Sequence, residues 1–414
     1  MKHVYTSVDI GSDTIKVVVC ELFNNKLNLL AASSVKSDGI KKGLIVDGKK
    51  ASVSLQKALA DVQEMLGIKI KKVIATVPNY FSEFNIIKGE IDLNPEEEIT
   101  GQDIVKVFQA AMKDQDKNNK EMVTIIPIDF SVDGTGNIKD PKGQKGSKLG
   151  TRAVMVLTPK KNILSVSSLL ENNGLEVVDF TLSSIGDVNS VKNPIIKNGV
   201  GAIINIGHET TSVSLYNKGI IVNNSMLGVG GKNIDGDIAY IYKLKPEDAT
   251  MIKERFALAH KQYASKSEYY ELTNKLNEDI KINQYEVSEI AMSRLEEILV
   301  LARKEINVLT NREVDYILIT GGTSSMNNFS LIAEDVLGDK TIIGDIRLVG
   351  LRNNKYSAAV GNIAYFIGKQ KLKGKLFSLI SRDDMEELSK NKRSALNASN
   401  ESMLGKVFGY FFSE

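Results

Sequence analysis

The sequence predicts an α/β protein of two related lobes, and three observations carry that prediction. Strand-like stretches are interleaved with amphipathic helical stretches, which is typical of α/β architecture. A strand-turn-strand segment near the start recurs in the second half of the chain. The chain has 414 residues, and domains usually hold about 150, so there is room for two to three domains.

The first half opens with a predicted hairpin, in which Val4–Ile10 and Ile15–Leu22 form strands and the chain turns at Gly11. Further strands are expected at Leu27–Ser34, Lys72–Val77, Ile86–Leu93, Val123–Val132, Ala153–Thr158 and Glu176–Thr181. Apolar residues spaced by three and four predict helices at Ala51–Leu66, Thr100–Met112 and Lys160–Asn172. Gly174 is expected to close the last of these helices in a left-handed conformation.

The second half begins with the same pattern as the first. Strands are expected at Gly201–Ile206 and Thr210–Tyr216, with a turn at Gly207. The segments DIGSDTIKVVV, from Asp9, and NIGHETTSVSL, from Asn205, share four identities, which pair Ile10 with Ile206, Gly11 with Gly207, Thr14 with Thr210, and Val17 with Val213. Such a duplication predicts a cleft between two similar lobes.

The rest of the second half is predicted from its hydropathy. Lys243–Thr310 is expected to be a long polar helical region. The run YILITGGTSSMNNFSLIAEDVLG, from Tyr316, predicts a buried strand, a Gly-Gly turn and a helix. After Ile367 the chain becomes rich in lysine and then polar. We expect a linker there, because the segment SRDDMEELSKNKRSALNASNES lacks the apolar residues needed to pack.

The final segment, MLGKVFGYFF, has one apolar face. On a helix, a single stripe is formed by Met403, Leu404, Val407, Phe408, Phe411 and Phe412. An apolar stripe beyond a polar linker is suited to lie in the headgroup region of a membrane without spanning it. The segment is therefore predicted to be a membrane-targeting helix, and a terminal helix docked on the protein body is the alternative.

Composition excludes several classes of partner and site. The formal net charge is only +2, so nucleic acid is not an expected partner. One cysteine, Cys20, and three histidines form neither an internal disulfide nor a Cys/His metal cage, which favours a reducing cytoplasm. The sequence shows no secretory signal and no apolar run of membrane-spanning length.

Three glycine turns are the candidate ligand-binding elements. At the first, Gly11 lets backbone N–H groups converge on a phosphate oxygen, with Asp9, Ser12 and Lys16 beside it. The second contains Gly207, Thr210 and Thr211, and would face the first across the cleft. The third offers backbone that can lie against a purine ring and ribose, at Gly321, Gly322 and Thr323. No Walker motif competes, because GVGGKN, from Gly228, lacks a Ser or Thr after its lysine.

The order of these turns resembles that in the actin/Hsp70/sugar-kinase superfamily and, within it, the FtsA family of bacterial cell division proteins. Besides DIGSDTIKVVV, the resemblance rests on the motifs SDGIKKGLIVD, VTIIPIDFSVDG, IKDPKG, GKNIDGDIA and ILITGGTSS. It runs from Val4 to Ile367 and resumes at the C-terminal helix. It implies a two-lobed actin-like fold, a duplicated ribonuclease H-like architecture, with an FtsA-type subdomain inserted in the first lobe.

The resemblance also implies a binding site for ATP and Mg²⁺. Asp9 would lie near the metal, through water, and near the γ-phosphate. Lys253 and Glu254 would border the base and ribose. The full set of residues implied to bind the nucleotide is Asp9, Gly11, Ser12, Asp13, Lys16, Asn205, Gly207, Thr210, Thr211, Gly230, Gly231, Lys253, Glu254, Gly321, Gly322 and Thr323.

Two departures from the superfamily pattern predict weak chemistry. Asn205 stands where the superfamily usually has aspartate, so one carboxylate for hydrated magnesium is missing, and His208 and Glu209 replace small residues. The segment FTLSSIGDVNS supplies no Glu or Gln to position an attacking water, although Asp187 is nearby. We therefore expect nucleotide binding with slow or undetectable hydrolysis, and a solvated or hydrogen-bonded His208 rather than a general base.

Mapped onto this chain, the resemblance implies a division into subdomains. The implied ranges are 1–81 with 162–192 for subdomain 1A, 82–161 for the inserted 1C, 193–225 with 316–368 for 2A, 226–315 for 2B, 369–400 for the linker and 401–414 for the membrane helix. Subdomain 1C would mediate protomer contacts in a filament, and 2B would receive the C-terminal tail of the tubulin-like FtsZ.

The resemblance thus implies an ATP-binding protein that polymerises on the inner face of the cytoplasmic membrane at the division site. It would anchor FtsZ filaments of the Z-ring there and help to recruit other division proteins. Two alternatives share the phosphate turns: a PilM-like adaptor of pilus or secretion assembly, and a small-molecule kinase of the same superfamily. An adaptor should lack the lipid-seeking helix, and a kinase needs an acidic base in the cleft.

Overall fold

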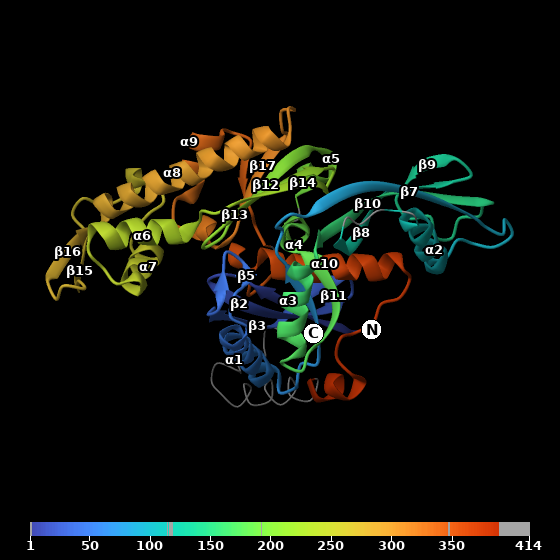
Figure 1. Ribbon diagram of the computed structural model, residues 1–414, viewed down its shortest axis with the longest axis horizontal. Coiled ribbons are helices and arrows are strands. Elements are labelled where there is room, and N and C mark those ends of the chain that lie inside the picture. The colour runs from blue at the N-terminus through green and yellow to red at the C-terminus, as the bar shows by residue number, and fades with distance from the viewer. Residues whose placement is uncertain (1, 114, 116–118, 192, 347, 389–414) are drawn as a thin grey trace, which may run out of the picture.

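The computed structural model describes residues 2–113, 115, 119–191, 193–346 and 348–388. Figure 1 shows two lobes, each built on a five-stranded sheet, with a smaller sheet to one side. The first sheet holds β11 (Glu176–Leu182), β6 (Lys72–Val77), β1 (His3–Ile10), β2 (Thr14–Phe23) and β3 (Lys26–Lys36), in that order. The second holds β14 (Ile220–Leu227), β13 (Thr211–Asn217), β12 (Val200–Ile206), β17 (Tyr316–Thr320) and β18 (Thr341–Ile343).

The two sheets have the same topology. In the first, β1 pairs antiparallel with β2 and β2 with β3, and then β6 and β11 add in parallel on the other side of β1. In the second, β12, β13 and β14 are antiparallel, while β17 and β18 add in parallel beside β12. The predicted α/β class and the predicted duplication of the chain are both confirmed.

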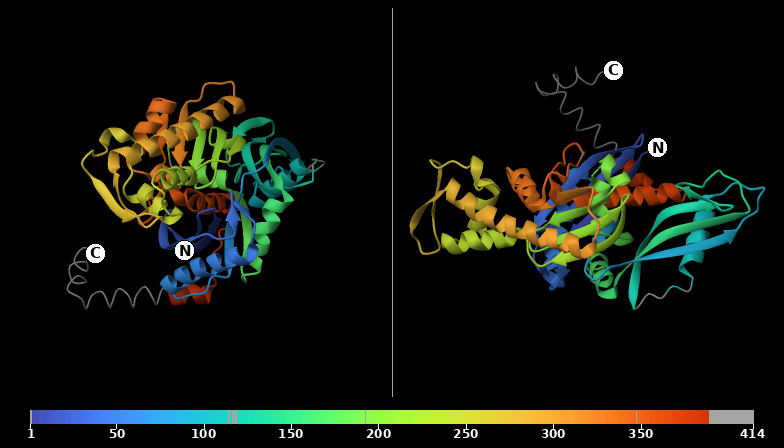
Figure 2. Two further views of the ribbon diagram at one scale, coloured as in Figure 1. Left: turned by 60° about the vertical axis from the view of Figure 1, so that its left-hand side comes forward. Right: turned by 90° about the horizontal axis from the view of Figure 1, so that it is seen from above.

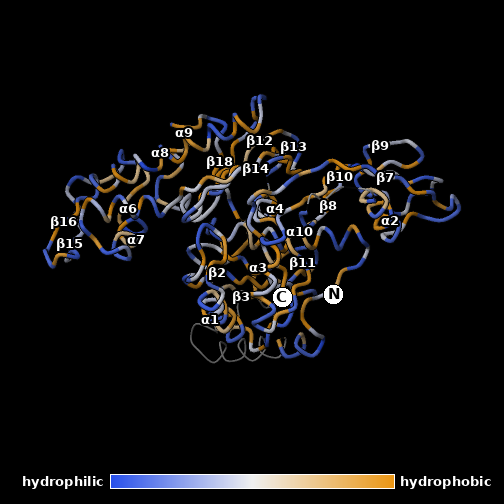
Figure 3. The backbone as a smooth tube through the Cα atoms, in the orientation of Figure 1, coloured by the Kyte–Doolittle hydropathy of each residue, from blue (hydrophilic) through white to orange (hydrophobic). Residues whose placement is uncertain are grey.

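Both faces of the first sheet are covered, and the sequence shows why. Successive residues of a strand point to opposite faces, so a strand buried on both sides must be apolar without interruption. In β2, Val17 and Val19 pack in the core that contains helices α1 (Gly48–Leu66) and α3 (Lys160–Glu171). Val18 and Cys20 face the other way, toward α10 (Ser357–Leu372). Figure 3 shows the apolar strands enclosed within each lobe.

Capping residues mark the starts and ends of the predicted helices. Asp47 caps α1 by accepting hydrogen bonds from the N–H groups of Lys49 and Lys50, and Gly67 ends it in the left-handed region. Thr100 caps α2 (Gly101–Met112). Gly174 has a φ of 75°, as predicted for the end of α3. The predicted strands of the first half are confirmed within a few residues at their ends.

The smaller sheet is an insertion between β6 and α3. It has the order β7 (Glu83–Asp92), β10 (Lys148–Pro159), β8 (Lys120–Val132) and β9 (Thr135–Ile138). Helix α2 lies on one face, so close that a Cβ on Gly89 would come within 2.4 Å of the Ala111 nitrogen. Val154 and Val156 belong instead to the core of the first lobe. The insertion therefore packs on the first lobe, within the range predicted for subdomain 1C.

One prediction for the second lobe is wrong. Lys243–Thr310 is not helical throughout: after α6 (Gly231–Ile241) and α7 (Pro246–Arg255), the chain forms β15 (Tyr269–Thr273) and β16 (Asp279–Asn283) before α8 (Gln284–Leu309). The physical reason is an alternation of apolar and polar residues with period two. Tyr270, Leu272, Ile280 and Ile282 face the core of the lobe, and the residues between them face solvent.

Helices α4 (Ser183–Ser190) and α10 cross between the two lobes (Figure 1). Their backbones nearly touch, because a Cβ built on Gly361 would lie only 1.7 Å from the Gly186 carbonyl oxygen. Residues 357–368 were predicted to belong to subdomain 2A. Instead, α10 packs its Ala359, Ile363 and Phe366 on the first sheet. The other subdomain boundaries stay predictions.

The segment after α10 corrects the predicted start of the linker. Residues 373–388 run along the first lobe (Figure 2) and end in helical residues 382–388. The N–H of Leu379 donates to the Val4 carbonyl at 2.8 Å, and Leu379 and Leu388 are buried in the first lobe. A few apolar residues are thus enough to pack this polar segment. The rest of the linker and the predicted membrane helix, residues 401–414, lie outside the described residues.

The remaining elements are short. They are β4 (Ile40–Lys41), β5 (Leu44–Ile45), α5 (Pro194–Asn198), α9 (Phe329–Leu337) and the 3₁₀ turns η1 (Lys261–Tyr263), η2 (Gly322–Ser325) and η3 (Asn354–Tyr356). None of the helices in the described part of the chain is both long enough and apolar enough to cross a bilayer.

The contact between α4 and α10 gives a stability prediction. We expect Gly361→Ala to lower the free energy of unfolding by about 3 kcal/mol, because the new methyl group would force the helices apart. The matched control is Gly368→Ala on the same helix, where a Cβ meets nothing within 4 Å. That change should stabilise the protein by about 0.5–1 kcal/mol. Urea denaturation measures both, and equal effects of the two variants would contradict this account of the crossing.

Candidate functional site

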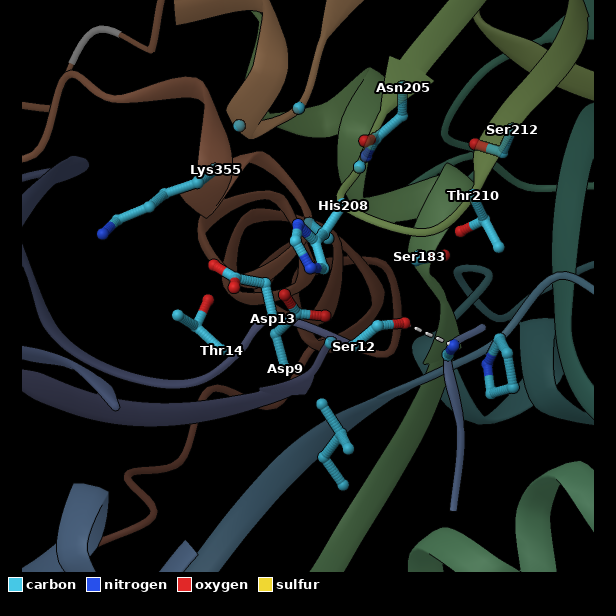
Figure 4. Close-up of a pocket in the computed structure, with 18 of the residues that line it drawn as sticks. Asp9, Ser12, Asp13, Thr14, Ser183, Asn205, His208, Thr210, Ser212 and Lys355 are labelled. Atoms are coloured by element: carbon cyan, nitrogen blue, oxygen red, sulfur yellow. Dashed lines mark hydrogen bonds between the residues drawn. The ribbon is translucent and has the colours of Figure 1, made fainter. Parts of the chain in front are cut away.

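A cleft of about 440 Å³ lies between the two lobes. Its walls are formed by the turn after β1, the turn after β12, the turn after β17 and the segment around η3. Figure 4 shows side chains from both lobes pointing into it, with Asp9, Ser12 and Asp13 on one side and Asn205, His208 and Thr210 on the other. The duplicated turns therefore face each other, as the duplication predicted.

Most of the predicted nucleotide-binding residues line this cleft. Those on its wall are Asp9, Gly11, Ser12, Asp13, Lys16, Asn205, Gly207, Thr210, Lys253, Glu254, Gly321, Gly322 and Thr323. Thr211, Gly230 and Gly231 do not line it. Thr211 is fully buried and its hydroxyl donates to the Val229 carbonyl at 2.9 Å, while the N–H of Gly231 donates to the Gly207 carbonyl at 2.9 Å. These three residues support the second turn from behind.

The two duplicated turns are closed by the same hydrogen bond. The N–H of Gly11 donates to the Thr14 carbonyl at 3.1 Å, and the N–H of Gly207 donates to the Thr210 carbonyl at 2.9 Å. In both turns a Cβ on the glycine would lie 3.0 Å from that same carbonyl oxygen. A residue without a side chain therefore keeps each turn tight. The residues that follow the two glycines, Ser12 and His208, line the cleft.

The third turn meets the second one directly. Gly321 has a φ of +93°, and a Cβ there would lie 2.4 Å from Asn205 Oδ1. The hydroxyl of Thr323 donates to the Gly207 carbonyl at 3.0 Å. These contacts hold the Gly-Gly turn against the turn at Gly207, so both line the same end of the cleft.

Each oxygen of the Asp9 carboxylate has a partner in the first lobe. Lys16 Nζ lies 2.9 Å from its Oδ2, and the Thr76 hydroxyl donates to its Oδ1 at 2.7 Å. Asp13, which lies in the turn between β1 and β2, forms an ion pair with Lys36. Burial alone would raise the pKa of Asp13, but the Lys36 ammonium outweighs it and the pKa is lowered. Both carboxylates are thus paired with a lysine.

Asp187 lies behind the wall of the cleft rather than on it. It is 1% exposed, and it accepts hydrogen bonds from the Ser357 hydroxyl at 2.6 Å and from Asn205 Nδ2 at 2.8 Å. Burial raises the pKa of Asp187 to about 6, although these two hydrogen bonds oppose the shift. With both oxygens occupied, Asp187 is not placed to activate a water molecule in the cleft.

Three further ionisable groups lie around the cleft: Lys253, Lys355 and His208. Lys253 Nζ lies 2.8 Å from Asp235 Oδ1 in a buried ion pair that is not aligned as a hydrogen bond. Lys355 points into the cleft (Figure 4), and burial together with the nearby Lys16 lowers its pKa. Burial also lowers the pKa of His208, which is therefore neutral at physiological pH. The ring of His208 lies close to Asp13, which belongs to the opposite lobe (Figure 4).

Sequence reasoning missed Lys355, and no local motif marks it. It lies on η3, which is held beside η2 by a 3.2 Å hydrogen bond from Asn354 Nδ2 to the Ser324 hydroxyl. Asn79 and Tyr80, in the loop after β6, also line the cleft without a sequence signal. Only the folding of distant segments onto the cleft brings these residues together.

Around Asp9 and the end of β12, the cleft does not offer free carboxylates of the kind that hydrated magnesium prefers. Asp9 is occupied by Lys16 and Thr76, position 205 carries a neutral amide, and Asp187 is turned away. Within the described ranges, no group of three His, Cys, Asp or Glu residues is arranged to hold a metal ion. The other carboxylates on the wall, besides the predicted magnesium ligand Asp9, are Asp13, which is paired with Lys36, and Glu254.

Comparison with known proteins identifies the family. The family model described as "Cell division protein FtsA" matches residues 202–361, and the model described as "SHS2 domain inserted in FTSA" matches residues 83–157. Cell division protein FtsA of Bacillus subtilis is 28% identical over 90% of this chain and 86% of its own length. FtsA of Streptococcus pneumoniae is 27% identical over 88% and 80%. The chain belongs to the FtsA family of cell division proteins.

Solved structures confirm the predicted fold class. A PilM-PilN type IV pilus biogenesis complex aligns with a TM-score of 0.59 and 14% identity, over 87% of this chain and 98% of the other. MreB5 of Spiroplasma citri bound to ADP aligns with a TM-score of 0.55 and 14% identity, over 90% and 98%. The fold is actin-like, with an SHS2 domain inserted in the first lobe.

The buried Asp187 makes a pH prediction. Because its pKa is raised on folding, the folded state holds the proton more tightly than the unfolded state between about pH 4 and pH 6. Its contribution to stability is therefore present at low pH and is lost as pH rises through about 6. Relative to Asp187→Asn, the wild type should lose about 1–2 kcal/mol of unfolding free energy between pH 5 and pH 7.5.

Urea denaturation of both proteins at the two pH values measures this difference. The readout is the change in the gap between them rather than either absolute value, since the substitution also alters the hydrogen bond with Asn205. A gap that is the same at both pH values would show that Asp187 is ionised throughout.

Proposed function

We propose that this protein binds ATP in the cleft between its lobes and works in cell division as an actin-like membrane tether for FtsZ filaments. The observation that carries the ATP assignment is the pair of duplicated turns facing each other across the cleft, each closed by a Gly N–H to Thr carbonyl hydrogen bond. A polyphosphate fits between two such turns, since each presents backbone N–H groups to an anion.

The nucleotide would lie across the cleft with its phosphates between Gly11 and Gly207. Lys16 and Lys355 would complement the phosphate charge from the first lobe and from η3. The adenosine would lie against the backbone of Gly322 and Thr323, with Lys253 and Glu254 bordering the base and ribose. Glycine at the third turn leaves room for a flat ring to approach the backbone.

ATP would act as a structural ligand that favours the closed arrangement of the lobes. Two hydrogen bonds already join the lobes at the cleft edge, from the Lys42 N–H to Glu209 Oε2 at 2.5 Å and from Asn224 Nδ2 to the Asn79 carbonyl at 2.9 Å. A ligand present at 100 times its Kd stabilises the state it binds by about 2.7 kcal/mol. We expect hydrolysis to be slow, because Asp187 is withdrawn behind the wall.

The partners follow from family membership. Among cell division proteins, the FtsA family is expected to polymerise and to bind the FtsZ tail, and we assign these contacts to the inserted subdomain (82–161) and to residues 226–315. The inserted sheet is suited to self-association because its edge strands, β7 and β9, each pair on one side only. Recruitment of further division proteins is part of the same proposal.

The C-terminal segment would place the protein on the inner face of the cytoplasmic membrane at the division site. The apolar stripe formed by Met403, Leu404, Val407, Phe408, Phe411 and Phe412 would insert at the headgroup boundary. The described chain ends at Leu388, which is packed on the first lobe. Residues 389–400 would then connect the protein body to this membrane-targeting segment.

An adaptor role in pilus assembly is the alternative, since the PilM-PilN complex shares the fold. Likeness at 14% identity supports the fold alone, whereas both matching family models are specific to FtsA. A small-molecule kinase is less well supported, because Asp9 and Asp13 are tied into ion pairs and Asp187 does not reach the cleft.

Blocking the third turn tests ATP binding. A Cβ on Gly322 would meet only Lys355, at 3.6 Å, so a larger side chain there is accommodated by the fold and projects beside Lys355. We expect Gly322→Leu to weaken ATP binding at least about tenfold by filling the space for adenosine. Gly322→Ala is the matched control and should stay within about threefold of wild type. Calorimetry with ATP measures both, and unchanged affinity in Gly322→Leu would contradict the placement.

Deleting residues 402–414 tests the membrane assignment. Full-length protein should sediment with anionic liposomes and carry FtsZ with it, whereas the truncated protein should remain in the supernatant and still bind ATP. The double substitution Phe408→Ser and Phe411→Ser separates apolar area from chain length, because it removes apolar area without shortening the chain. Soluble behaviour of the full-length protein with liposomes would favour a helix docked on the protein body.

A further inference from the structure

The end of β12 places an amide where the cleft would be expected to offer a carboxylate. Asn205 lines the cleft, and its Nδ2 donates to Asp187 Oδ2 at 2.8 Å. The second oxygen of Asp187 accepts from the Ser357 hydroxyl at 2.6 Å. The carboxylate of this pair is therefore buried behind the wall, and the wall itself presents a neutral group. An amide oxygen holds a hydrated divalent cation much less strongly than a carboxylate does.

Of the carboxylates that do line the cleft, Asp9 and Asp13 each already have a cation, Lys16 and Lys36. Lys16 Nζ lies 2.9 Å from Asp9 Oδ2, and both side chains are about nine-tenths buried. The other oxygen of Asp9 accepts from the Thr76 hydroxyl at 2.7 Å. A magnesium ion held through water by Asp9 would compete with an ammonium group that is built into the hairpin. Lys16 thus supplies positive charge at this point without a metal.

Lysines outnumber carboxylates on the walls of the cleft. The charged residues that line it are Lys16, Lys42, Lys253, Lys355, Asp9, Asp13 and Glu254. Lys355 forms no ion pair with a carboxylate in the part of the chain that the structure describes. Its ammonium is half-buried and lies near the like-charged Lys16, an arrangement that an anionic ligand would stabilise. The cleft is therefore charged to accept a polyphosphate directly.

We propose that this cleft binds ATP without requiring a divalent cation, with Lys16 and Lys355 balancing the phosphate charge that magnesium would otherwise neutralise. This inference rests on the proposed ATP binding and adds its ionic requirement. The neutral amide of Asn205 is the feature that distinguishes the site, because it places no carboxylate at the end of β12, and Asp13, a second carboxylate on the wall, is already paired with Lys36.

The Asn205–Asp187 hydrogen bond allows a matched exchange. The double substitution Asn205→Asp and Asp187→Asn keeps one carboxylate and one amide at the same two positions, and it preserves the bond with donor and acceptor reversed. It moves the carboxylate from the buried position onto the wall of the cleft. The total charge of the protein is unchanged, so any gain in metal dependence is due to the position of the carboxylate.

The test is calorimetric titration of the full chain with ATP, in excess MgCl₂ and in excess EDTA. For the wild type we expect the two Kd values to agree within about threefold. For the exchanged protein we expect magnesium to tighten binding by at least about tenfold. Lys355→Ala should weaken binding in EDTA about tenfold, whereas Lys355→Arg should retain most of the affinity.

Each other outcome has a definite meaning. If the wild type binds ATP with magnesium and more than about threefold more weakly in EDTA, the inference is overturned while the proposed function stands. If the exchanged protein also binds equally well in both buffers, the role given to position 205 is wrong. If no ATP binds in either buffer, the proposed function fails, and this inference fails with it.

Discussion

The close crossing of α4 and α10 is the constraint on which the rest of the structure depends. The two sheets are joined through these helices, and their backbones approach until Gly361 and Gly186 leave no room for a side chain. Asp187 and Ser357, one on each helix, are joined by a buried hydrogen bond beside this contact. Two glycines and one polar pair therefore fix how closely these helices approach, and this contact contributes to the distance between the lobes and to the width of the cleft. The spacing between the two duplicated turns therefore depends on the contact between α4 and α10.

Electrostatics in the cleft follow from the same arrangement. Asn205 reaches from the second lobe to Asp187, so the buried carboxylate is shared between the hinge helices and the wall of the site. A carboxylate at position 205 would place two like charges side by side in a buried setting, which is unfavourable unless one is protonated. The amide removes that conflict. With an amide at position 205, the ion pair between Asp9 and Lys16 is the charged interaction at this point of the wall. The hydrogen bond that joins the lobes at Asn205 thus also affects the charge of the site.

The sequence was most informative where periodicity and glycine turns coincide. The hairpin around Gly11, the repeat at Gly207 and the strand before Gly321 were all predicted, because their apolar alternation and turn residues are local. The hairpin of β15 and β16 was missed because its strands are short and mostly polar between Tyr270 and Ile282. Lys355 was missed for another reason: it reaches the cleft only through the packing of η3 on η2, which is a long-range contact. The packed segment around Leu379 shows that sparse apolar residues can hold a polar stretch when a neighbouring strand end is free to bond.

A crystal structure of the full chain grown with saturating ATP tests the central claim most directly. The account predicts one nucleotide between the lobes, with its phosphates against the backbone N–H groups that follow Gly11 and Gly207 and its base beside Gly322. A nucleotide bound elsewhere, or a cleft that stays empty at saturating ATP, would contradict the account.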